Sequence, residues 1–135
     1  MTTGPLLGAD DLRRLARERH GSGRCPACGG LRCKGWEALP GGFDASVLER
    51  IGTLRDPRVD DPTVQEYHPG GSDTWSPDAP IAPAFHPFNK SDAWRCTTCA
   101  RLFLRYTEYG GYYHEERIRE VDPALVVDTP PGTVQ

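Results

Sequence analysis

The sequence has no run of about 18 apolar residues, the length that a membrane-spanning helix requires. Residues 1–8 contain neither a basic leader nor the apolar stretch of a signal peptide. These absences exclude a transmembrane helix and favour a cytoplasmic protein that does not bind membranes. Thiols stay reduced in the cytoplasm, so disulfide bonds are disfavoured as the use of the cysteines.

The sequence also lacks an excess of positive charge. Lysine and arginine total 16 residues against 19 aspartates and glutamates, which leaves a formal net charge of -3. Proteins that bind a phosphate backbone depend on clustered lysine and arginine, so this balance disfavours nucleic acid as the partner. Lysine itself is scarce, at 2 residues, and this preference for arginine favours a bacterial source with a GC-rich genome.

Apolar residues are fewer than in an average globular protein, at 37%, while glycine (15) and proline (13) are abundant. Long irregular segments are expected, and such segments bury little apolar surface for the entropy lost on folding. A chain of 135 residues has the usual size of one domain. We predict a single domain over residues 1–128 that needs a cross-link, followed by a disordered tail, 129–135.

Two Cys-x-x-Cys units supply that cross-link. Cys25 and Cys28 form the first unit, and Cys96 and Cys99 form the second. Two thiolates three positions apart in a tight turn point to one side, so two such turns that face each other complete a tetrahedral cage of sulfur. We therefore predict a zinc ion bound by these four residues, with iron as the alternative metal because four thiolates suit both.

The 67 residues between the two units do not prevent this pairing. Closing a flexible loop of that length costs about 4 kcal/mol. Structural zinc contributes about 10–16 kcal/mol of apparent binding free energy in small peptides. Zinc therefore outweighs the loop, and we expect the part of the fold around it to be lost when the metal is removed.

The segment Cys25-Pro26-Ala27-Cys28-Gly29 resembles the zinc knuckles of zinc-ribbon and rubredoxin-like proteins. The second unit departs from that pattern, because Ala100 follows Cys99 where the family usually has glycine. A left-handed conformation at Ala100 would cost about 1–2 kcal/mol. The segment that begins at Trp94 and continues into the tyrosine-rich stretch to Tyr113 is similar to bacterial zinc-ribbon proteins. The resemblance implies a fold held by metal and implies no activity.

The sequence indicates the roles of the remaining cysteine and of the histidines less clearly than the role of the two Cys-x-x-Cys units. Cys33 is a substitute ligand, a reactive thiol or, as we favour, a small buried residue on the strand after the first knuckle. His68 and His86 lie in a proline-rich stretch, and His114 lies beside Glu115 in a strand, where neighbouring side chains point to opposite faces. Redox chemistry of a Cys-x-x-Cys pair is disfavoured because neither unit opens a βαβ pattern.

Periodicity and capping residues predict four regular segments. A helix is expected over 11–20, capped by Asp10, and a second short helix over 45–51, capped by Asp44. A short strand is expected over 31–36, and a β-hairpin from 101–107 and 112–121. We therefore predict an α+β fold: a small zinc ribbon, made of the short strand and the C-terminal β-hairpin, with two short helices and a long loop.

That loop is the insert between residues 56 and 90, which contains seven prolines and shows no helical or strand periodicity. It also carries aromatic side chains that a solvated linker would not need, so we expect an ordered loop. Some of these aromatics, with tyrosines of the hairpin, are candidates for contact with a partner. The candidates are Trp75, Phe85, Phe88, Tyr109 and Tyr113.

Four thiolates close the coordination sphere of a metal and leave no position for water or substrate. We therefore predict a non-enzymatic protein with structural zinc that acts as a protein-interaction or accessory module, with another protein as its partner. The first alternative is a nucleic-acid-binding ribbon that uses Arg101, Arg105, Arg117 and Arg119. The second is an enzyme whose site lies in the insert, which would require a deep pocket around its histidines.

Overall fold

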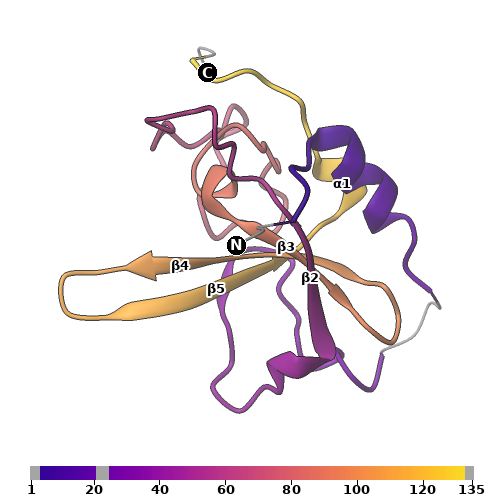
Figure 1. Cartoon of the computed structure of the whole chain (residues 1–135). Coiled ribbons are helices and arrows are strands. Elements are labelled where there is room, and N and C mark those ends of the chain that lie inside the picture. The colour runs from indigo at the N-terminus through magenta and orange to yellow at the C-terminus, as the bar shows by residue number, and fades with distance from the viewer. Residues whose placement is uncertain (1–3, 21–24, 133–135) are drawn as a thin grey trace.

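Five strands form one antiparallel sheet in the computed structural model, which describes residues 4–20 and 25–132 (Figure 1). The strands follow the order β1-β5-β4-β3-β2 across the sheet. Their bounds are Glu37–Ala38 for β1, Leu48–Thr53 for β2, Asp92–Cys96 for β3, Leu102–Tyr109 for β4 and His114–Glu120 for β5. The helix α1 spans Ala9–Ala16, and short 3-10 turns span Ala45–Val47, Phe88–Lys90 and Pro123–Leu125.

The fold is therefore mostly β, and the expected small ribbon with two short helices is wrong. Among the described residues α1 is the one α-helix, and it lies where the first helix was predicted but starts at Ala9 rather than Asp11. Its N-terminus is closed by the Asp11 carboxylate, which accepts a hydrogen bond from the Gly8 N–H at 2.8 Å, so Asp10 is not the cap. No part of the described chain forms a helix long and apolar enough to cross a membrane.

The second predicted helix, 45–51, is instead a 3-10 turn that leads into strand β2. Asp44 does cap this turn, because its carboxylate accepts a hydrogen bond from the Ser46 N–H at 3.0 Å. From Leu48 onward, however, the backbone pairs with β3, with Leu48 opposite Cys96. A helix of seven residues is not stable without tertiary packing, and the free edge of β3 offers a full ladder of hydrogen bonds. Pairing within the sheet therefore outweighed the local capping signal.

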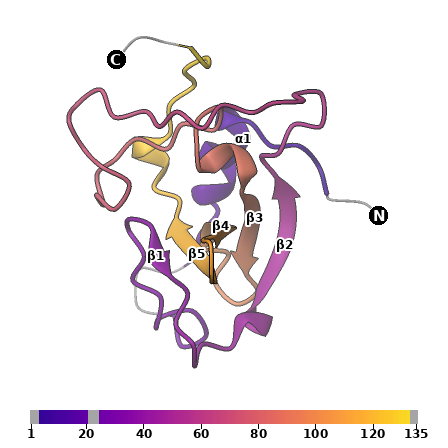
Figure 2. The same cartoon turned by 90° about the vertical axis from the view of Figure 1, so that its left-hand side faces the viewer.

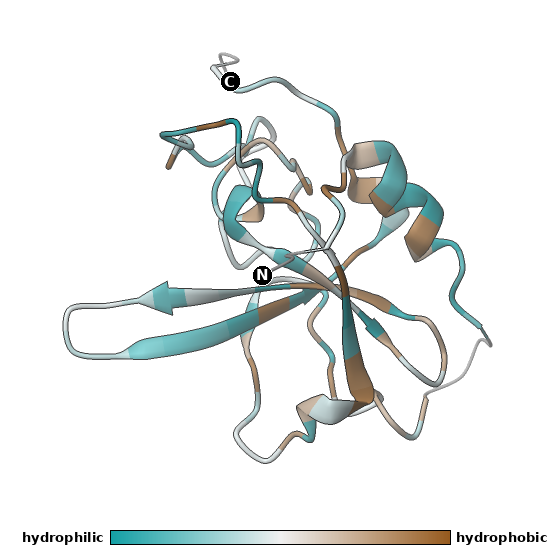
Figure 3. Cartoon of the chain, viewed as in Figure 1, coloured by the Kyte–Doolittle hydropathy of each residue, from teal (hydrophilic) through white to brown (hydrophobic). Residues whose placement is uncertain are grey.

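The hairpin of β4 and β5 is present and forms the centre of the sheet. Its register pairs Phe103 with Glu120 at the base and Tyr109 with His114 at the far end. The far end extends beyond the rest of the molecule and is hydrophilic, whereas the base is apolar (Figure 3). The strand expected over 31–36 is not formed, and the strand that pairs with β5 is limited to Glu37 and Ala38. Single backbone hydrogen bonds on either side, from the Glu120 N–H to the Cys33 carbonyl and from the Leu39 N–H to the Glu116 carbonyl, extend the contact with β5.

Two apolar cores lie on opposite faces of the sheet, because neighbouring residues of β4 point in opposite directions. Leu102, Leu104 and Tyr106 face the first core, which includes α1 and the insert. Phe103 faces the second core, which includes all five cysteines. Figure 2 shows α1 and the insert at one end of the molecule and the segment that precedes β2 at the other.

The insert, 56–90, is an ordered loop that covers the first core. Ile81 is fully buried, and its N–H donates to the Leu125 carbonyl at 2.9 Å while its carbonyl accepts from Val127. Phe85 and Phe88 are buried as well, and Phe85 stacks against Tyr67 with ring centroids 5.0 Å apart. Ile81 and Val126 form a single parallel bridge, which joins the insert to the segment that follows β5.

Candidate metal centre

Four buried cysteines from the two ends of the chain meet at one point beneath the sheet. The sulfur atoms of Cys25, Cys28, Cys96 and Cys99 all lie within 4.8 Å of one another. The Sγ atoms of Cys25 and Cys96 are 3.9 Å apart, and those of Cys28 and Cys99 are 3.6 Å apart. Four sulfurs about 2.3 Å from a shared tetrahedral zinc lie about 3.8 Å from each other. The cluster therefore fits a metal ion held by four thiolates.

Each knuckle is a tight turn closed by backbone hydrogen bonds. In the first, the Gly29 N–H donates to the Cys25 carbonyl at 2.7 Å, and in the second the Ala100 N–H donates to the Cys96 carbonyl at 3.0 Å. The second knuckle is the turn between β3 and β4, so the sheet itself holds Cys96 and Cys99 in place. The Thr98 N–H also points at the Cys96 sulfur, 3.4 Å away. Such N–H groups stabilise thiolate.

The thiols of the cluster differ in acidity. A hydrogen bond from the Cys28 backbone lowers the pKa of Cys25 to about 7. Burial raises the pKa of Cys28 to about 12, and burial also raises the pKa of Cys99. The Cys25 thiol therefore ionises at a lower pH than the thiols of Cys28 and Cys99. A metal ion must displace protons from the buried thiols, so its binding weakens as the pH falls.

Arg101, which the sequence pattern indicated only as a candidate for contact with nucleic acid, is a buried neighbour of the cluster. Its guanidinium donates to the Cys28 carbonyl at 3.2 Å, lies 3.8 Å from the Cys28 sulfur and forms an ion pair with Glu120 at 2.9 Å. Burial acts to lower the pKa of Arg101, but the ion pair with Glu120 outweighs it and the net shift is upward. Arg101 therefore stays positively charged beside sulfurs that carry a net charge of about -2 once a divalent ion is bound.

Ala100 adopts the left-handed conformation anticipated from the missing glycine, with φ of 65°. We predict that Ala100→Gly raises the free energy of unfolding of the metal-loaded protein by about 1 kcal/mol, because the side-chain clash disappears while the unfolded chain gains some entropy. Urea unfolding measures this change. The matched control is Ala27→Gly in the first knuckle, where φ is not positive, and this change is expected to lower stability by about 0.5–1 kcal/mol. Destabilisation by Ala100→Gly would contradict the prediction.

Cys33 lies in the second core, fully buried, and does not belong to the four-cysteine cluster. Burial raises the pKa of its thiol to about 12. Cys33 is therefore a small buried residue of the core, the interpretation favoured from the sequence. Trp36, which lies near the first knuckle in sequence, packs instead in the first core against Phe88 and Tyr106, with ring centroids 5.5 and 4.8 Å away.

The structure separates the five aromatic candidates for partner contact into two groups. Phe85 and Phe88 are buried in the molecule, so neither offers a surface to a partner. Trp75, Tyr109 and Tyr113 are exposed, together with Tyr112, which the sequence interpretation did not include. Trp75 lies under the guanidinium of Arg117, 4.7 Å from the ring centroid, so the insert meets strand β5 at this residue.

Two histidines of the insert do come together, in a cluster that also contains Glu66 and Thr74. His68 Nε2 lies 2.9 Å from a Glu66 carboxylate oxygen, which also accepts from the Thr74 hydroxyl at 2.5 Å. Burial lowers the pKa of His86. The cavity that these residues line with Trp36 and Arg119 has a volume of only about 10 Å³, the space of a single water molecule. His114 lies apart from them, at the exposed end of the hairpin.

No protein-family model matches the chain, and neither the curated proteins nor the solved structures compared with it contain a match.

Proposed function

We propose that the chain is a non-enzymatic protein-interaction module whose four clustered cysteines hold a structural zinc ion. The observation that carries this proposal is the closed set of four buried sulfurs with separations suited to a tetrahedral ion. Four sulfur ligands leave no open position at which a substrate or a reactive water could bind. A protein folded around such an ion in the reducing cytoplasm would retain it without a disulfide.

Zinc is the metal we propose, since it is colourless and redox-inert and prefers four thiolates in structural sites. Iron would occupy the same sulfurs and give a coloured protein. Metal analysis by mass spectrometry, together with an absorption spectrum of the purified protein, tests this choice. One zinc per chain without visible colour is expected, and one iron per chain with a red protein would overturn it.

The proposed contact surface consists of Trp75 and the hairpin tip, by which we mean residues 109–114. Tyr109 is 79% exposed, Tyr113 is 58% exposed and Trp75 is 51% exposed. The hairpin projects beyond the rest of the sheet, so its tip can reach a partner without rearrangement (Figure 1). Tyrosine and tryptophan are enriched at the centres of protein interfaces, because each buries a large area while losing little side-chain entropy.

Binding of nucleic acid would require free arginines, and the four arginines considered for this role all have partners within the chain. Three of the four arginines named for it form ion pairs within the chain, Arg101 with Glu120, Arg105 with Glu116 and Arg117 with Glu115. The fourth, Arg119, is fully buried and donates to the carbonyls of Lys34 and Ala79. A phosphate would have to displace these partners, which argues against binding to a phosphate backbone.

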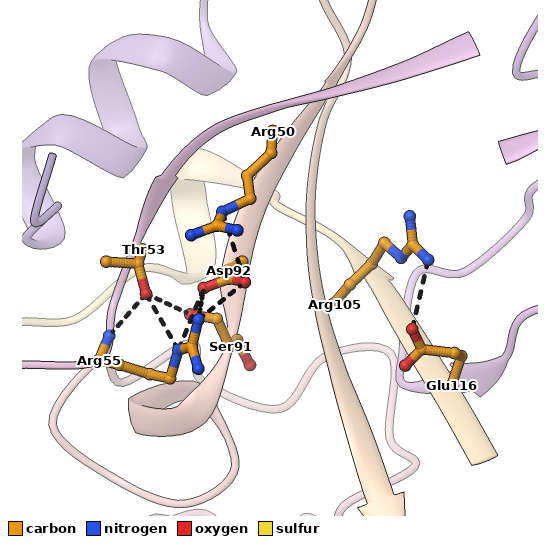
Figure 4. A network of polar contacts seen from close by, with 7 residues as sticks. All are labelled: Arg50, Thr53, Arg55, Ser91, Asp92, Arg105 and Glu116. Atoms are coloured by element: carbon orange, nitrogen blue, oxygen red, sulfur yellow. Dashed lines mark hydrogen bonds and ion pairs between the residues drawn. The ribbon is translucent and has the colours of Figure 1, made fainter. Parts of the chain in front are cut away.

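The arginines of the neighbouring strands are also engaged by carboxylates. Arg55 donates three hydrogen bonds to Asp92, at 2.9, 3.1 and 3.2 Å, and Arg50 approaches the same carboxylate at 3.6 Å (Figure 4). Arg105 stacks over the ring of Trp94, 4.4 Å from its centroid. Positive charge on this face of the sheet is therefore neutralised locally, and a salt-dependent affinity for oligonucleotides is not expected.

The enzyme alternative requires a pocket that the histidine cluster does not provide. A cavity of about 10 Å³ admits no substrate, even though Glu66, His68 and Thr74 are within hydrogen-bond distance of one another. We interpret these polar contacts as the means by which the insert is held in its ordered shape, since buried polar groups require partners.

The interaction role is tested by purifying tagged protein from its native cells after crosslinking and identifying what it retains. We predict that the double variant Trp75→Ala, Tyr113→Ala loses more than about 90% of the recovered partner, because each such truncation at an interface centre costs about 2 kcal/mol. The matched control is Val64→Ala, which removes another exposed apolar side chain outside the proposed surface. Equal recovery with the double variant, measured at equal zinc content, would overturn the proposed surface.

A further inference from the structure

A second candidate site is a cleft on the side of the sheet away from the cysteine cluster. Four segments enclose it: residues 6–9 before and at the start of α1, residues 54–63 and 83–89 from the two ends of the insert, and the C-terminal residues 128–131. Its volume is about 530 Å³. Sites for small organic ligands have volumes of about 300–1,000 Å³.

Apolar side chains form most of the wall of this cleft. Leu7 and Leu54 are buried at its base, while Leu6 and Val59 stand at its opening with exposed fractions of 41% and 48%. Three prolines, Pro62, Pro83 and Pro131, complete the wall. Large apolar side chains left exposed around a concave surface are typical of binding sites. The wall therefore favours a ligand with an aliphatic body.

The charged groups of the cleft are all negative. Asp56, Asp61 and Asp128 line it, and no lysine, arginine or histidine does so among the described residues. Asp56 forms an ion pair with Arg58 at 2.9 Å, whereas Asp61 and Asp128 form none within the described chain. A cavity with apolar walls and two uncompensated carboxylates attracts positive charge, because low-dielectric walls strengthen the field of those carboxylates.

The amide of Asn89 adds a further acceptor. Its nitrogen already donates to the carbonyls of Thr63 and Ala84, at 2.8 and 3.4 Å, so its oxygen is left as the group that can bind a ligand. A ligand that carries hydrogen-bond donors is therefore favoured over one that carries acceptors. An ammonium group supplies three donors and a positive charge together.

We propose that this cleft binds a small aliphatic amine, with the alkyl chain against Leu6, Leu54 and Val59 and the ammonium group between Asp61 and Asp128. The site is independent of the metal centre and of the proposed contact surface. An amine bound here would give a function to a cleft in which the proposed zinc ion plays no part.

The proposal is tested on the metal-loaded full chain with three probes of equal length: octylammonium, octanol and octyl sulfate. Binding is followed by NMR chemical-shift titration of backbone amides. We expect saturable binding of octylammonium with shifts concentrated at residues 6–9, 54–63 and 128–131. Its affinity should exceed that of octanol by about tenfold, and octyl sulfate should bind most weakly of the three.

Five variants separate binding in the cleft from a general effect of the protein's charge on affinity. Asp61→Asn is expected to weaken octylammonium about fivefold and Asp128→Asn by a similar factor, as for a partly exposed ion pair. The control Asp60→Asn removes the same charge one residue away from a position that lines the cleft, and should leave affinity within about twofold. Val59→Lys should abolish binding, while Val64→Lys, outside the cleft, should not.

Equal affinity for the three probes would overturn the proposed charge preference. An effect of Asp60→Asn as large as that of Asp61→Asn would show that only overall charge attracts the amine. Shifts spread over the whole surface, or no saturable binding of any probe, would overturn the cleft as a ligand site. None of these results depends on the interaction role proposed for Trp75 and the hairpin tip.

Discussion

Cys96→Ser is expected to lose the bound metal and leave no stably folded protein at 25 °C. Structural zinc contributes about 10–16 kcal/mol in small peptides, whereas the whole free energy of unfolding of a domain is about 5–15 kcal/mol. The loss of one ligand of a closed four-thiolate site therefore removes a contribution as large as the total stability. The buried thiols left behind would also lack a partner.

Loss of the metal is expected to unfold the protein because the cysteine cluster lies within the second core. Residues 25–36 form no strand, so besides the cluster this segment is joined to the sheet by a few hydrogen bonds, such as those from Arg101 to the Cys28 carbonyl and from the Glu120 N–H to the Cys33 carbonyl. Without the ion, this segment loses its anchor, and Phe103 and Ile118 lose the covering that buries them. Hydrogen exchange should therefore rise first over residues 25–47 and then over the hairpin.

Metal content by mass spectrometry and thermal unfolding by circular dichroism measure the effect, with a chelator added to wild type as a second route to the metal-free state. The matched control is Cys33→Ala, which changes a buried cysteine of the same core that lies outside the cluster. It should retain one metal ion per chain and lose about 1 kcal/mol. A native melting temperature for Cys96→Ser, or for the chelated protein, would contradict a structural metal.

Arg101→Met is expected to lower the free energy of unfolding by about 3 kcal/mol and weaken metal binding 10–100-fold. The variant leaves Glu120 without its buried partner and removes the positive charge beside the Cys28 sulfur. Breaking a buried ion pair on one side is strongly destabilising, and groups that contact metal ligands commonly change affinity by that factor. Urea unfolding of the loaded protein and competition with a chelator of known affinity measure the two effects separately.

Arg19→Met is the matched control, because Arg19 pairs with the other oxygen of the Glu120 carboxylate at 3.2 Å but from the surface. An exposed pair contributes less than about 1 kcal/mol, and within the described chain Arg19 does not contact a cysteine sulfur, so metal affinity should not change. Arg101→Lys keeps the charge but lacks the planar fork that reaches both Cys28 and Glu120, so partial rescue is expected. Equal effects of Arg101→Met and Arg19→Met would contradict a role of Arg101 at the metal centre.

The candidate metal ligands could be predicted from the sequence because the signal of each knuckle is local. Two cysteines at positions i and i+3 converge in any tight knuckle turn, so the spacing of each unit predicts its geometry without knowledge of the fold. The left-handed backbone at Ala100 was anticipated for the same reason. The hairpin was also predicted, since alternation on both sides of Gly110 and Gly111 is a short-range pattern.

The errors arose where distant segments competed with local signals. Asp44 was a correct cap, yet residues 48–53 became strand β2 because β3 lies beside them in space. Trp36 lies close to the first knuckle in sequence, yet it packs against Phe88 and Tyr106 in the core on the opposite face of the sheet from the cysteines. Phe85 and Phe88 were candidates for a partner, and the core of the molecule buries them instead.

The amino-acid sequence alone determined that each Cys-x-x-Cys unit would form a knuckle and that the C-terminal third would fold into a hairpin, because both depend on interactions between residues close along the chain. The tertiary structure alone decided that the sheet has five strands, that Arg101 and Glu120 stand beside the sulfurs, and that four separate segments enclose an acidic, apolar cleft. Such contacts join residues that are well separated along the chain, and no local spacing encodes them, because burial is decided only when all the packed elements are in place.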